Sequence, residues 1–410
     1  MGFNNLGLSP RLLEAVARLG YTEPTPIQLN AIPLALEGRD IVGTAQTGTG
    51  KTAAFILPTL QRIQAKPGAV RALVITPTRE LAAQIDTVAT AVGKVTGHKV
   101  ASIYGGVGYE PQRKALKRGV DLLVACPGRL LDLVREGYCD LSKVEVLIID
   151  EADRMLDMGF WPDVKRILGH LPEQRQNLLF SATMSPGVLR VVNDTLHDPA
   201  EIQVTATNTP IEAIRQEIYP VGSRDKVDLL LHLIKEHNLS RVLVFTRTKH
   251  RADRVARVLE RANIKGATIH GDRSQAQRDR ALQSFRNGKV QVLVATDVVA
   301  RGIDIDDISH VINYDLPDTP ESYTHRIGRT ARAGREGAAF TLMAPEELPI
   351  LREIERAINH VLDTADAEGF DYTDFRTTPD PKREAAPARK PFSSRKFGGR
   401  GRSSGYGSKR

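Results

Sequence analysis

Short apolar runs that alternate with amphipathic stretches constrain the fold of this chain more than any other feature. They form two series, at residues 72–75, 120–125, 144–149 and 178–180, and at residues 242–245, 290–295, 311–314 and 338–343. Runs of this length between helical patterns are typical of βαβ units, which build parallel sheets covered by helices. The sequence therefore predicts an α/β fold with two parallel sheets.

The length of the chain and a polar stretch between the two series predict the domain boundaries. A chain of 410 residues exceeds what one hydrophobic core normally organises. Residues 205–212 are polar and lack apolar periodicity, which is typical of a linker. We expect an N-terminal domain at residues 1–204, the linker at 205–212, a C-terminal domain at 213–363 and a tail at 364–410.

Basic charge is concentrated near the C-terminal end. Residues 381–410 hold ten Lys or Arg and one acid, Glu384, a net charge of +9, whereas the whole chain carries +8. The segment is rich in Gly, Ser, Pro and Arg and cannot bury a core, so we predict a disordered tail. Its interleaved aromatic residues suit sequence-tolerant contact with nucleic-acid phosphates and bases. A tail that only improves solubility is the alternative.

A Gly-rich turn follows the strand-like residues 40–43. It runs from Ala45 to Thr52 and contains Thr47, Gly48, Thr49, Gly50 and Lys51. The backbone N–H groups of such a turn can wrap a polyphosphate, while the Lys ammonium meets the terminal phosphates and the Thr hydroxyl meets Mg²⁺. Because the strict pattern begins with Gly where this chain has Ala45, the turn predicts a nucleotide site only together with a second element.

The second element is an acidic tetrad at the end of a strand-like run. Asp150, Glu151, Ala152 and Asp153 follow residues 144–149. Parallel sheets gather their ligands at the carboxyl ends of strands, and the turn and the tetrad both occupy such positions. We expect Asp150 to hold Mg²⁺ through its water shell and Glu151 to deprotonate the attacking water. Together the two elements predict ATP hydrolysis.

Cysteine usage and hydropathy bear on the compartment. Cys126 and Cys139 form neither a metal-binding spacing nor a disulfide framework, which fits a reducing cytosol. No stretch approaches the ~20 apolar residues of a membrane span, and the N-terminus carries no charged-then-apolar signal. We therefore expect a soluble, cytoplasmic protein with no membrane partner.

From Phe3 to about Asn359 the chain resembles a DEAD-box RNA helicase of superfamily 2, whose motifs it carries in the family's order. The resemblance implies two tandem RecA-like domains with parallel sheets flanked by helices, and ATP and Mg²⁺ as cofactors. Residues 20–28 resemble the motif that reads adenine. They imply that Phe3, Tyr21 and Gln28 hold the base, because a carboxamide can pair with adenine but not with guanine. The compact core and basic tail look most like bacterial RhlE-type helicases.

Three segments of the first half resemble the family's strips that hold one RNA strand by its backbone. They contribute Pro77, Thr78 and Arg79; Gly105 and Gly106; and Pro127, Gly128 and Arg129. Helix N-termini, close-approach glycines and an Arg suit phosphates whatever base is attached, so the implied grip is independent of sequence. The family usually has Thr where this chain has Cys126, and we expect a weaker RNA contact there.

The segment Ser181-Ala182-Thr183 resembles the family's motif that links the acidic site to strand separation. We expect the hydroxyl groups of Ser181 and Thr183 to hydrogen-bond the Asp153 carboxylate. Such contacts would couple the position of the acidic loop to the neighbouring strand end. An N-cap for a helix that begins at Pro186 is the alternative interpretation.

The second half carries the family's arginine-finger segment, from His325 to Arg332. Arg329 and Arg332 lie one helical turn apart, so both guanidinium groups can point toward the γ-phosphate. The resemblance also implies that His325 pairs with the acidic loop and that Asp304 contacts the ATP ribose. The remaining positions implied to contact RNA are Arg247, Gln277, Arg280 and Thr296.

The resemblance implies an RNA-dependent ATPase that acts as an RNA helicase. ATP and RNA would favour the same closed arrangement of the two domains, and hydrolysis would release it. Local duplex unwinding and remodelling of RNA or ribonucleoprotein would follow. Two alternatives stay open: a DNA helicase or remodeller that shares the two-domain core, and an ATP-gated RNA clamp or annealing chaperone without productive unwinding.

Overall fold

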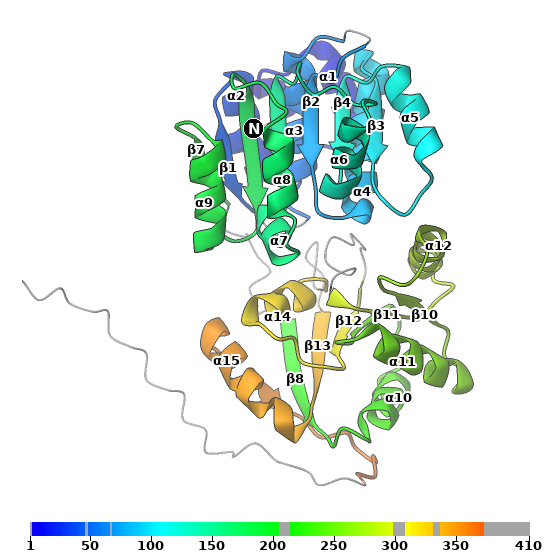
Figure 1. The fold of residues 1–410 in the computed structure, drawn as a ribbon. Helices are drawn as coiled ribbons and strands as arrows, with labels where there is room; N and C mark the ends of the chain where they lie inside the picture. The colour runs from blue at the N-terminus through cyan, green and yellow to red at the C-terminus, as the bar shows by residue number, and fades with distance from the viewer. Residues whose placement is uncertain are drawn as a thin grey trace, which may run out of the picture.

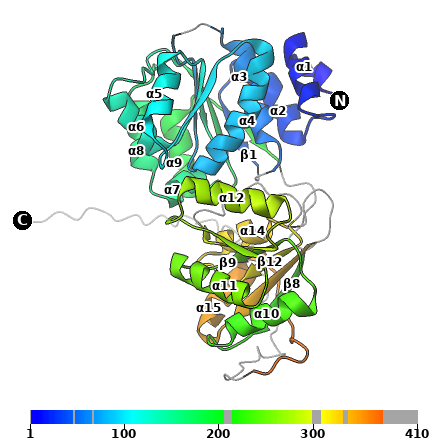
Figure 2. The ribbon, with the colours of Figure 1, turned by 90° about the vertical axis from the view of Figure 1, so that its right-hand side faces the viewer.

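The structure is a computed structural model that describes residues 2–45, 48–65, 68–204, 214–297, 308–330 and 337–372. These residues form two α/β domains, which lie one above the other in Figures 1 and 2. Each domain is built around a seven-stranded sheet in which all paired strands are parallel. None of the described helices is long and apolar enough to cross a membrane.

The first sheet has the strand order β3-β4-β2-β5-β6-β1-β7. Its strands are β1 (Ile41–Thr44), β2 (Ala72–Ile75), β3 (Val100–Ile103), β4 (Leu122–Ala125), β5 (Val146–Ile149), β6 (Gln176–Ser181) and β7 (Ala200–Gln203). The helices of this domain are η1 (Phe3–Asn5), α1 (Pro10–Arg18), α2 (Pro26–Leu36), α3 (Lys51–Arg62), α4 (Arg79–Thr96), α5 (Tyr109–Lys117), α6 (Pro127–Arg135), α7 (Ala152–Asp157), α8 (Trp161–Leu168) and α9 (Pro186–Thr195).

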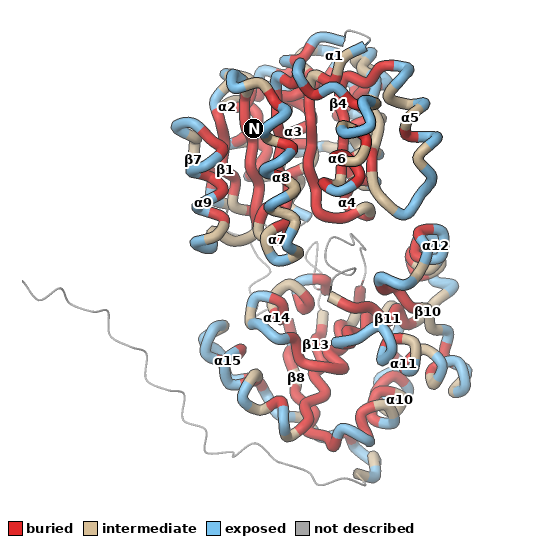
Figure 3. Tube along the Cα trace, in the orientation of Figure 1, coloured by how far each residue is buried: buried red, intermediate tan, exposed pale blue. Residues whose placement is uncertain are grey.

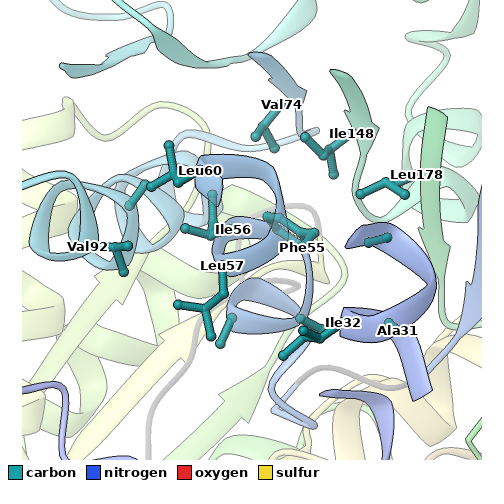
Figure 4. Packing of buried hydrophobic residues seen from close by; sticks show 14 of the residues in the cluster. Ala31, Ile32, Phe55, Ile56, Leu57, Leu60, Val74, Val92, Ile148 and Leu178 are labelled. Carbon is teal, nitrogen blue, oxygen red and sulfur yellow. The ribbon is translucent and has the colours of Figure 1, made fainter. Parts of the chain in front are cut away.

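Helices cover both faces of the first sheet because its strands are apolar on both faces. Successive side chains of a strand point to opposite sides, so Val74 packs in one apolar layer and Leu73 and Ile75 pack in the other. Figure 4 shows the first layer, in which side chains of α2, α3 and α4 meet those of the strands. Each fully buried Phe, Leu or Ile contributes about 1.5–3 kcal/mol, so these layers hold the strand ends in place.

The second sheet has the strand order β10-β11-β9-β12-β13-β8-β14. Its strands are β8 (Ile214–Pro220), β9 (Val242–Phe245), β10 (Gly266–Ile269), β11 (Val292–Ala295), β12 (His310–Asn313), β13 (Gly337–Met343) and β14 (Asp363–Thr364). The helices are α10 (Lys226–Glu236), α11 (Lys249–Arg261), α12 (Gln275–Arg286), α14 (Pro320–Ile327), η3 (Pro345–Glu347) and α15 (Leu348–Ile358). Figure 3 shows strands buried and outward helix faces exposed in both domains.

The two domains share one topology. Within each domain the third strand of the chain forms one edge, and the fourth, second, fifth, sixth, first and seventh strands follow in that order. Loops at the carboxyl ends of the strands of both sheets line a cavity between the domains. The ligand-binding edges of the two parallel sheets therefore face each other, as the RecA-like prediction requires.

The end of the second domain lies further along the chain than predicted. We expected the tail to begin at residue 364, but Thr364 pairs with Ile218 of β8, and Ala367, Phe370 and Tyr372 pack against the core of the second domain. The aromatic rings of Phe370 and Tyr372 lie in edge contact at 4.8 Å, which adds buried apolar area to a short segment. The expected linker at 205–212 and the tail from residue 373 lie outside the described residues.

Candidate active site

The Gly-rich turn ends at the first residue of α3, as a phosphate-binding turn does. Gly48 and Gly50 take the left-handed backbone conformation, with φ of 88° and 89°, and Gly50 is the N-cap of the helix. Lys51 is buried, and its Nζ donates a hydrogen bond of 2.8 Å to the carbonyl of Ala45. The ammonium is thereby folded back over the turn, at the positive end of the helix dipole, where polyphosphates bind. Thr47 lies outside the described residues.

Gln28 links the predicted adenine motif to the phosphate turn. It is the N3 residue of α2, where its Oε1 accepts from the backbone N–H of Thr25 at 3.0 Å. Its Nε2 donates to the carbonyl of Gly50, also at 3.0 Å. Gly50 has φ of 89°, which strains any other residue, and a Cβ there would also lie 2.5 Å from this nitrogen. The base-reading residue and the turn therefore form one connected unit.

Phe3 and Tyr21 pack together near the start of the chain. Their ring centroids lie 6.5 Å apart and the rings are stacked with an interplanar angle of 21°. Phe3 is buried, and burial raises the pKa of Tyr21 above its ordinary value. Both rings belong to the apolar layer that also holds Ile27 of α2, next to Gln28. The three residues predicted to hold adenine thus share one region of the first domain.

The acidic tetrad stands where β5 ends and α7 begins. Burial raises the pKa of Asp150, and this effect is larger than the lowering caused by the charge of Lys51. Burial also acts to raise the pKa of Glu151. The charges of Arg154 and Lys51 together lower it by more, so the pKa of Glu151 falls below its ordinary value. The pKa values of two adjacent carboxylates are therefore shifted in opposite directions, which is typical of sites where two acids have different catalytic roles.

Arg154 is a site residue that we did not predict. Its Nη1 donates to Oε2 of Glu151 at 3.0 Å, and both side chains are buried. Glu151 itself takes a left-handed backbone conformation with φ of 54°, which turns the chain sharply from strand to helix. The i,i+3 spacing on a helix start was the available signal, but a tetrad followed by Arg is equally compatible with a solvated surface.

The contacts of Ser181 and Thr183 agree with the predicted coupling in part. Thr183 donates to Oδ2 of Asp153 through both its Oγ1, at 3.2 Å, and its backbone N–H, at 3.1 Å. Ser181 instead accepts a hydrogen bond of 3.2 Å from the backbone N–H of Asp153. The N-cap of α9 is Ser185, whose Oγ accepts from Val188 N–H. Ser181 and Thr183 thus join two strand ends and do not cap the helix.

The first two predicted RNA strips lie together. Thr78 is the N-cap of α4 and accepts from the backbone N–H of Leu81. The next residue, Arg79, lies directly against the loop after β3, because a Cβ at Gly106 would be 1.7 Å from its Nη1. Gly106 has φ of 76°, a backbone conformation that favours glycine. Pro77 and Gly105 flank these contacts.

The third strip begins α6 and reaches the same loop. Pro127 is its first residue and Gly128 its second, with open space around the position of a Cβ. Cys126 is the N-cap but makes no capping hydrogen bond through its side chain, and burial raises the pKa of its thiol to about 12. A neutral thiol therefore stands where the family usually has a hydroxyl.

Arg129 of the third strip is buried against the loop after β3. Its Nη2 donates to the carbonyl of Val107 at 3.0 Å and its Nη1 to Oε1 of Gln112 at 3.3 Å. The guanidinium also lies 3.7 Å from the ring centroid of Tyr109. These contacts make Arg129 the support of the loop, in addition to any contact with phosphate. The three strips follow β2, β3 and β4, on the half of the sheet edge away from the phosphate turn.

Residues of both domains line a cavity of about 990 Å³ between them. Its walls include Asp153, Thr183, Arg247, Thr296, His325 and Arg326. Arg329 is buried and lies near enough to Glu151 to lower the pKa of that carboxyl. The predicted arginine finger and the predicted base thus approach each other across the domain boundary. Arg332 and Asp304 lie outside the described residues.

Arg326 organises the second domain's side of the cavity, and we did not predict it. Its Nε and Nη2 bind the two carboxylate oxygens of Asp297 at 2.6 and 2.7 Å. Its Nη1 donates to the carbonyl of Asp315 at 2.6 Å. This bidentate pair ties α14 to the ends of β11 and β12 and sets the direction of the segment that carries His325 and Arg329.

Helix α12 carries the predicted RNA-contact residues Gln277 and Arg280, and it also places Arg278 against the first domain. Gln277 is used to cap the helix, where its Oε1 accepts from Ser274 N–H, and Arg280 is exposed and bonds the carbonyl of Ala276. Arg278 instead reaches across the boundary and pairs with Glu80 of α4 at 2.6 Å. Both partners are almost wholly buried, with side chains 9% and 4% exposed. Figures 1 and 2 show α12 at this boundary.

Comparisons with known proteins agree with this geometry. Residues 25–191 match the DEAD/DEAH box helicase family, and residues 225–334 match the helicase conserved C-terminal domain. The DEAD-box ATP-dependent RNA helicase CshA of Geobacillus kaustophilus is 44% identical over 354 residues, which cover 86% of this chain and 76% of that protein. CshA of Streptococcus pneumoniae serotype 4 is 47% identical over 355 residues, which cover 87% and 68%.

Solved structures show the same architecture. S. cerevisiae Dbp5 bound to RNA and ADP BeF3 has a TM-score of 0.82 at 32% identity, covering 90% of this chain and 96% of that one. Mss116 bound to single-stranded RNA and UDP-BeF has a TM-score of 0.79 at 28% identity, covering 87% and 78%. A Dbp5 variant bound to Nup159, Gle1, IP6 and ADP scores 0.61 at 31% identity, covering 88% and 95%.

The relatives correct one expectation. Both curated relatives described above carry the name CshA, so the resemblance to the RhlE-type subfamily is not supported. The compact core and basic tail that favoured that subfamily are features of composition, and composition does not separate subfamilies that share a core. At 44% and 47% identity over most of its length, the chain belongs to the DEAD-box family of ATP-dependent RNA helicases.

Proposed function

We propose that the chain hydrolyses ATP in one composite site between its two domains and that this cycle separates short RNA duplexes and remodels RNA or ribonucleoprotein. The approach of Arg329 in the second domain to Glu151 in the first carries the proposal. A base and a charge clamp that lie on different domains can act together only when the domains close. Hydrolysis is thereby tied to a change in domain arrangement.

The residues of the first domain fit a nucleotide with its metal. Lys51 meets the terminal phosphates, the Thr52 hydroxyl and the Asp150 carboxylate offer oxygen ligands, and Glu151 accepts the proton of the attacking water. Oxygen donors are those that Mg²⁺ prefers, and the metal would neutralise charge on the phosphates. Within the described residues no cluster of three or more His, Cys, Asp or Glu side chains could hold a metal. Because Thr52 and Asp150 offer only part of the oxygen shell that Mg²⁺ takes, phosphate and water oxygens would supply the rest.

Gln28 makes ATP the favoured nucleotide. Its carboxamide can donate to one adenine edge atom and accept from the N6 amino group, a pairing that guanine cannot offer. The hydrogen bond from Gln28 to Gly50 supports a second consequence, because a base that engages the carboxamide would also affect the phosphate turn. Phe3 and Tyr21 supply the apolar surface for the base.

The three strips hold one RNA strand through its backbone. Their helix N-termini and glycines stand at the ends of β2, β3 and β4, and Arg247 and Thr296 of the second domain line the cavity between the domains. Contacts of this type recognise phosphate and sugar and carry little sequence information. Gln277 and Arg280 of α12 would add contacts from the second domain, since both side chains are exposed.

ATP and RNA are coupled through the closed arrangement. The Dbp5 structure that holds RNA and ADP BeF3 matches this chain at a TM-score of 0.82, against 0.61 for the form that holds Nup159, Gle1, IP6 and ADP. The difference supports a domain arrangement like that of the RNA-bound form. Each ligand that favours closure then raises the affinity for the other, and loss of the γ-phosphate contact after hydrolysis reopens the cleft.

We also propose a cytoplasmic location for the protein and an RNA-binding role for its C-terminal tail. Cys126 and Cys139 are free thiols, which fits the reducing cytoplasm. The basic residues of 381–410 would add non-specific RNA affinity, since counterion release favours any polyanion.

Steady-state ATP hydrolysis with RNA, with single-stranded DNA of the same sequence, and with neither tests the proposal. We expect stimulation by RNA alone, followed by displacement of a short RNA duplex. Equal stimulation by DNA would favour a DNA helicase, and stimulation without displacement would favour an RNA clamp or annealing factor. Either result would contradict the proposal.

Glu151→Gln gives the matched variant for the same assays. The substitution keeps the shape and polarity of the side chain but removes the base. We expect ATP and RNA binding to persist, measured by fluorescence anisotropy of labelled ligands, while kcat falls by at least about two orders of magnitude, the usual contribution of a general base. Turnover close to wild type would show that Glu151 does not activate the water.

A further inference from the structure

A row of stacked cations and aromatic rings starts at the third RNA strip and runs along α5. The guanidinium of Arg129 lies 3.7 Å from the ring centroid of Tyr109, and that of Arg113 lies 5.2 Å from the same ring. Arg113 also lies 4.6 Å from the ring of Tyr138, and Nζ of Lys117 lies 5.5 Å from it. We call these five residues the α5 ladder.

Neighbouring contacts hold the α5 ladder in one arrangement. Tyr109, Arg113 and Lys117 are spaced by four residues and share one face of the helix. The Tyr109 hydroxyl donates to Asp132 at 3.0 Å, and Arg113 pairs with Glu136 at 2.6 Å. Cations held in place lose less side-chain entropy when they meet a ligand than free surface lysines do.

The surface around the α5 ladder has an excess of positive charge. Its exposed or half-exposed cations are Lys99, Arg113, Lys114, Lys117 and Arg118. The exposed or half-exposed acids of α5 and α6 are Glu110, Asp132 and Glu136; Asp132 accepts from Tyr109 and Glu136 is paired with Arg113. Nζ of Lys99 donates to the carbonyl of Arg118, which brings the start of β3 to the end of α5. The excess charge thus lies along α5 from Arg113 to its C-terminal end.

We propose that the α5 ladder binds the RNA strand where it leaves the strips of the first domain, so that the RNA-binding surface continues along α5 beyond the composite site. The inference rests on the proposed function and extends it. Continuity favours RNA as the occupant, because Arg129 belongs both to the third strip and to the ladder. The nine residues of α5 span about 13 Å, which matches roughly four phosphates of a stacked strand.

The chemistry of the ladder also fits an RNA strand. Ammonium and guanidinium groups meet phosphates without regard to sequence, and half-buried Tyr rings beside them offer apolar surface to sugars and bases. An acidic protein segment is the other occupant that a basic surface admits. Nothing about such a segment requires its site to begin at the RNA strips. Binding measurements with RNAs of two lengths distinguish the two occupants.

The double variant Lys114→Gln and Lys117→Gln tests the proposal in the full-length chain. Both side chains are exposed, and neither residue lies in the strips or the ATP site. The matched control is Lys235→Gln with Lys289→Gln, two exposed lysines that precede β9 and β11 and so lie at the edge of the second sheet away from the cavity. Binding is measured with a non-hydrolysable ATP analogue and single-stranded RNAs of about 6 and about 20 nucleotides, within and above typical site sizes.

We expect the ladder variant to bind the long RNA several-fold more weakly and to keep wild-type affinity for the short one. Its salt slope on the long RNA should shrink by about 1.4, because each of the two removed cations neutralises one phosphate and accounts for roughly 0.7 of the slope. The control variant should match wild type on both RNAs. Unchanged affinity for the long RNA, which is also the result expected of a protein-binding surface, would overturn the proposal, and so would an equal decrease on both RNAs.

Failure of the ladder and failure of the proposed function give different results. If the proposed function is wrong, the wild-type chain itself shows no RNA-stimulated ATP hydrolysis with either RNA. If only the ladder is wrong, wild type and the double variant are stimulated alike at every RNA length. Two results together support both proposals. Saturating short RNA stimulates ATP hydrolysis equally in both proteins, and the variant needs a higher concentration of long RNA for half-maximal stimulation.

Discussion

At the residue scale, the chemistry of the site depends on two adjacent carboxylates whose surroundings shift their pKa values differently. Asp150 and Glu151 are both buried, and within the part of the chain that the structure describes Glu151 receives a direct ion pair from Arg154. Burial raises the pKa of both groups, and Arg154 and Lys51 reverse this effect at Glu151. A base whose pKa is lowered stays deprotonated over a wider pH range, at the cost of some basicity.

Replacing Arg154 by Gln should change the pH dependence of ATP hydrolysis. Removal of the guanidinium leaves burial as the larger influence, so the pKa of Glu151 rises. The base then becomes protonated at a higher pH, and the acid limb of the kcat profile should move upward. The measurement is RNA-saturated kcat as a function of pH.

Arg166→Gln is the matched control for Arg154→Gln. Arg166 pairs with Asp163 at the same i,i+3 spacing and at 3.1 Å, but on the exposed surface of α8. It should leave the profile unchanged, because exposed pairs contribute little. If the acid limb of the Arg154 variant stays at its wild-type position, then Arg154 does not set the protonation of the base.

At the element scale, each sheet holds its loops in place because its strands are buried on both faces. The runs at 72–75 and 242–245 coincide with β2 and β9, and those at 120–125, 144–149 and 290–295 contain β4, β5 and β11. Such near-continuous apolar runs are the signature of central parallel strands, so the sequence predicted them. The strands without that signature were not predicted: β3, β7, β8, β10 and β14.

The missed strands lie at or near the sheet edges. β3 and β10 are the edge strands of their sheets and are half exposed at their starts, so no long apolar run marks them. β14 has only two residues, both exposed, and depends on pairing with β8. Their strand conformation comes from hydrogen bonding to a neighbour that lies elsewhere in the chain, which local sequence does not encode.

Gly43→Ala should destabilise the first domain. Gly43 lies in β1, where a Cβ would be 2.6 Å from Cδ1 of Phe180 in β6, and Phe180 packs in turn on Phe55. Overpacking of this kind costs about 1–3 kcal/mol. Trp161 is the single tryptophan and lies in the first domain, so its fluorescence during urea unfolding reports the change there.

Gly271→Ala is the control for the stability prediction. No atom lies within 4 Å of the position of its Cβ, and its φ is not positive, so the substitution has room. It also belongs to the other domain and should leave the urea midpoint reported by Trp161 unchanged. An equal midpoint for Gly43→Ala and wild type would mean that Phe180 moves aside without cost.

The arrangement of the two domains is the property that belongs to the whole molecule. The Arg278–Glu80 pair is buried between α12 and α4, and Arg326 fixes α14 against the strand ends of its own domain. A buried pair contributes little net stability by itself, but the loss of one partner leaves a charge without compensation. The pair therefore favours one relative placement of the domains.

Arg278→Gln should weaken the coupling between RNA and ATP. Closure would then bury Glu80 without its partner, so the RNA concentration for half-maximal ATP hydrolysis should rise at least tenfold, equivalent to about 1.4 kcal/mol. Arg261→Gln, at the exposed C-terminal end of α11, should behave as wild type. The readout is ATP hydrolysis titrated with RNA, and equal half-saturation in all three proteins would contradict a role in closure.

Truncation after residue 380 should lower RNA affinity and flatten its dependence on salt. Removal of ten basic residues removes phosphate contacts, each worth a slope of roughly 0.7 on single strands. A full-length variant with those ten residues replaced by Gln separates charge from length and should match the truncation. A salt slope equal to that of wild type in both proteins would leave the tail with a solubilising role.

The sequence by itself determined the chemistry and its order along the chain. The Gly-rich turn, the acidic tetrad and the arginine segment are each written in consecutive residues, and the strand-end positions of the turn and the tetrad follow from local apolar patterns. Tertiary structure alone decided which charges meet: Arg154 on Glu151, Arg278 on Glu80 and the α5 ladder on the third strip. These contacts join separate elements, or depend on which face of a helix is buried, so their energies arise only after the chain has packed.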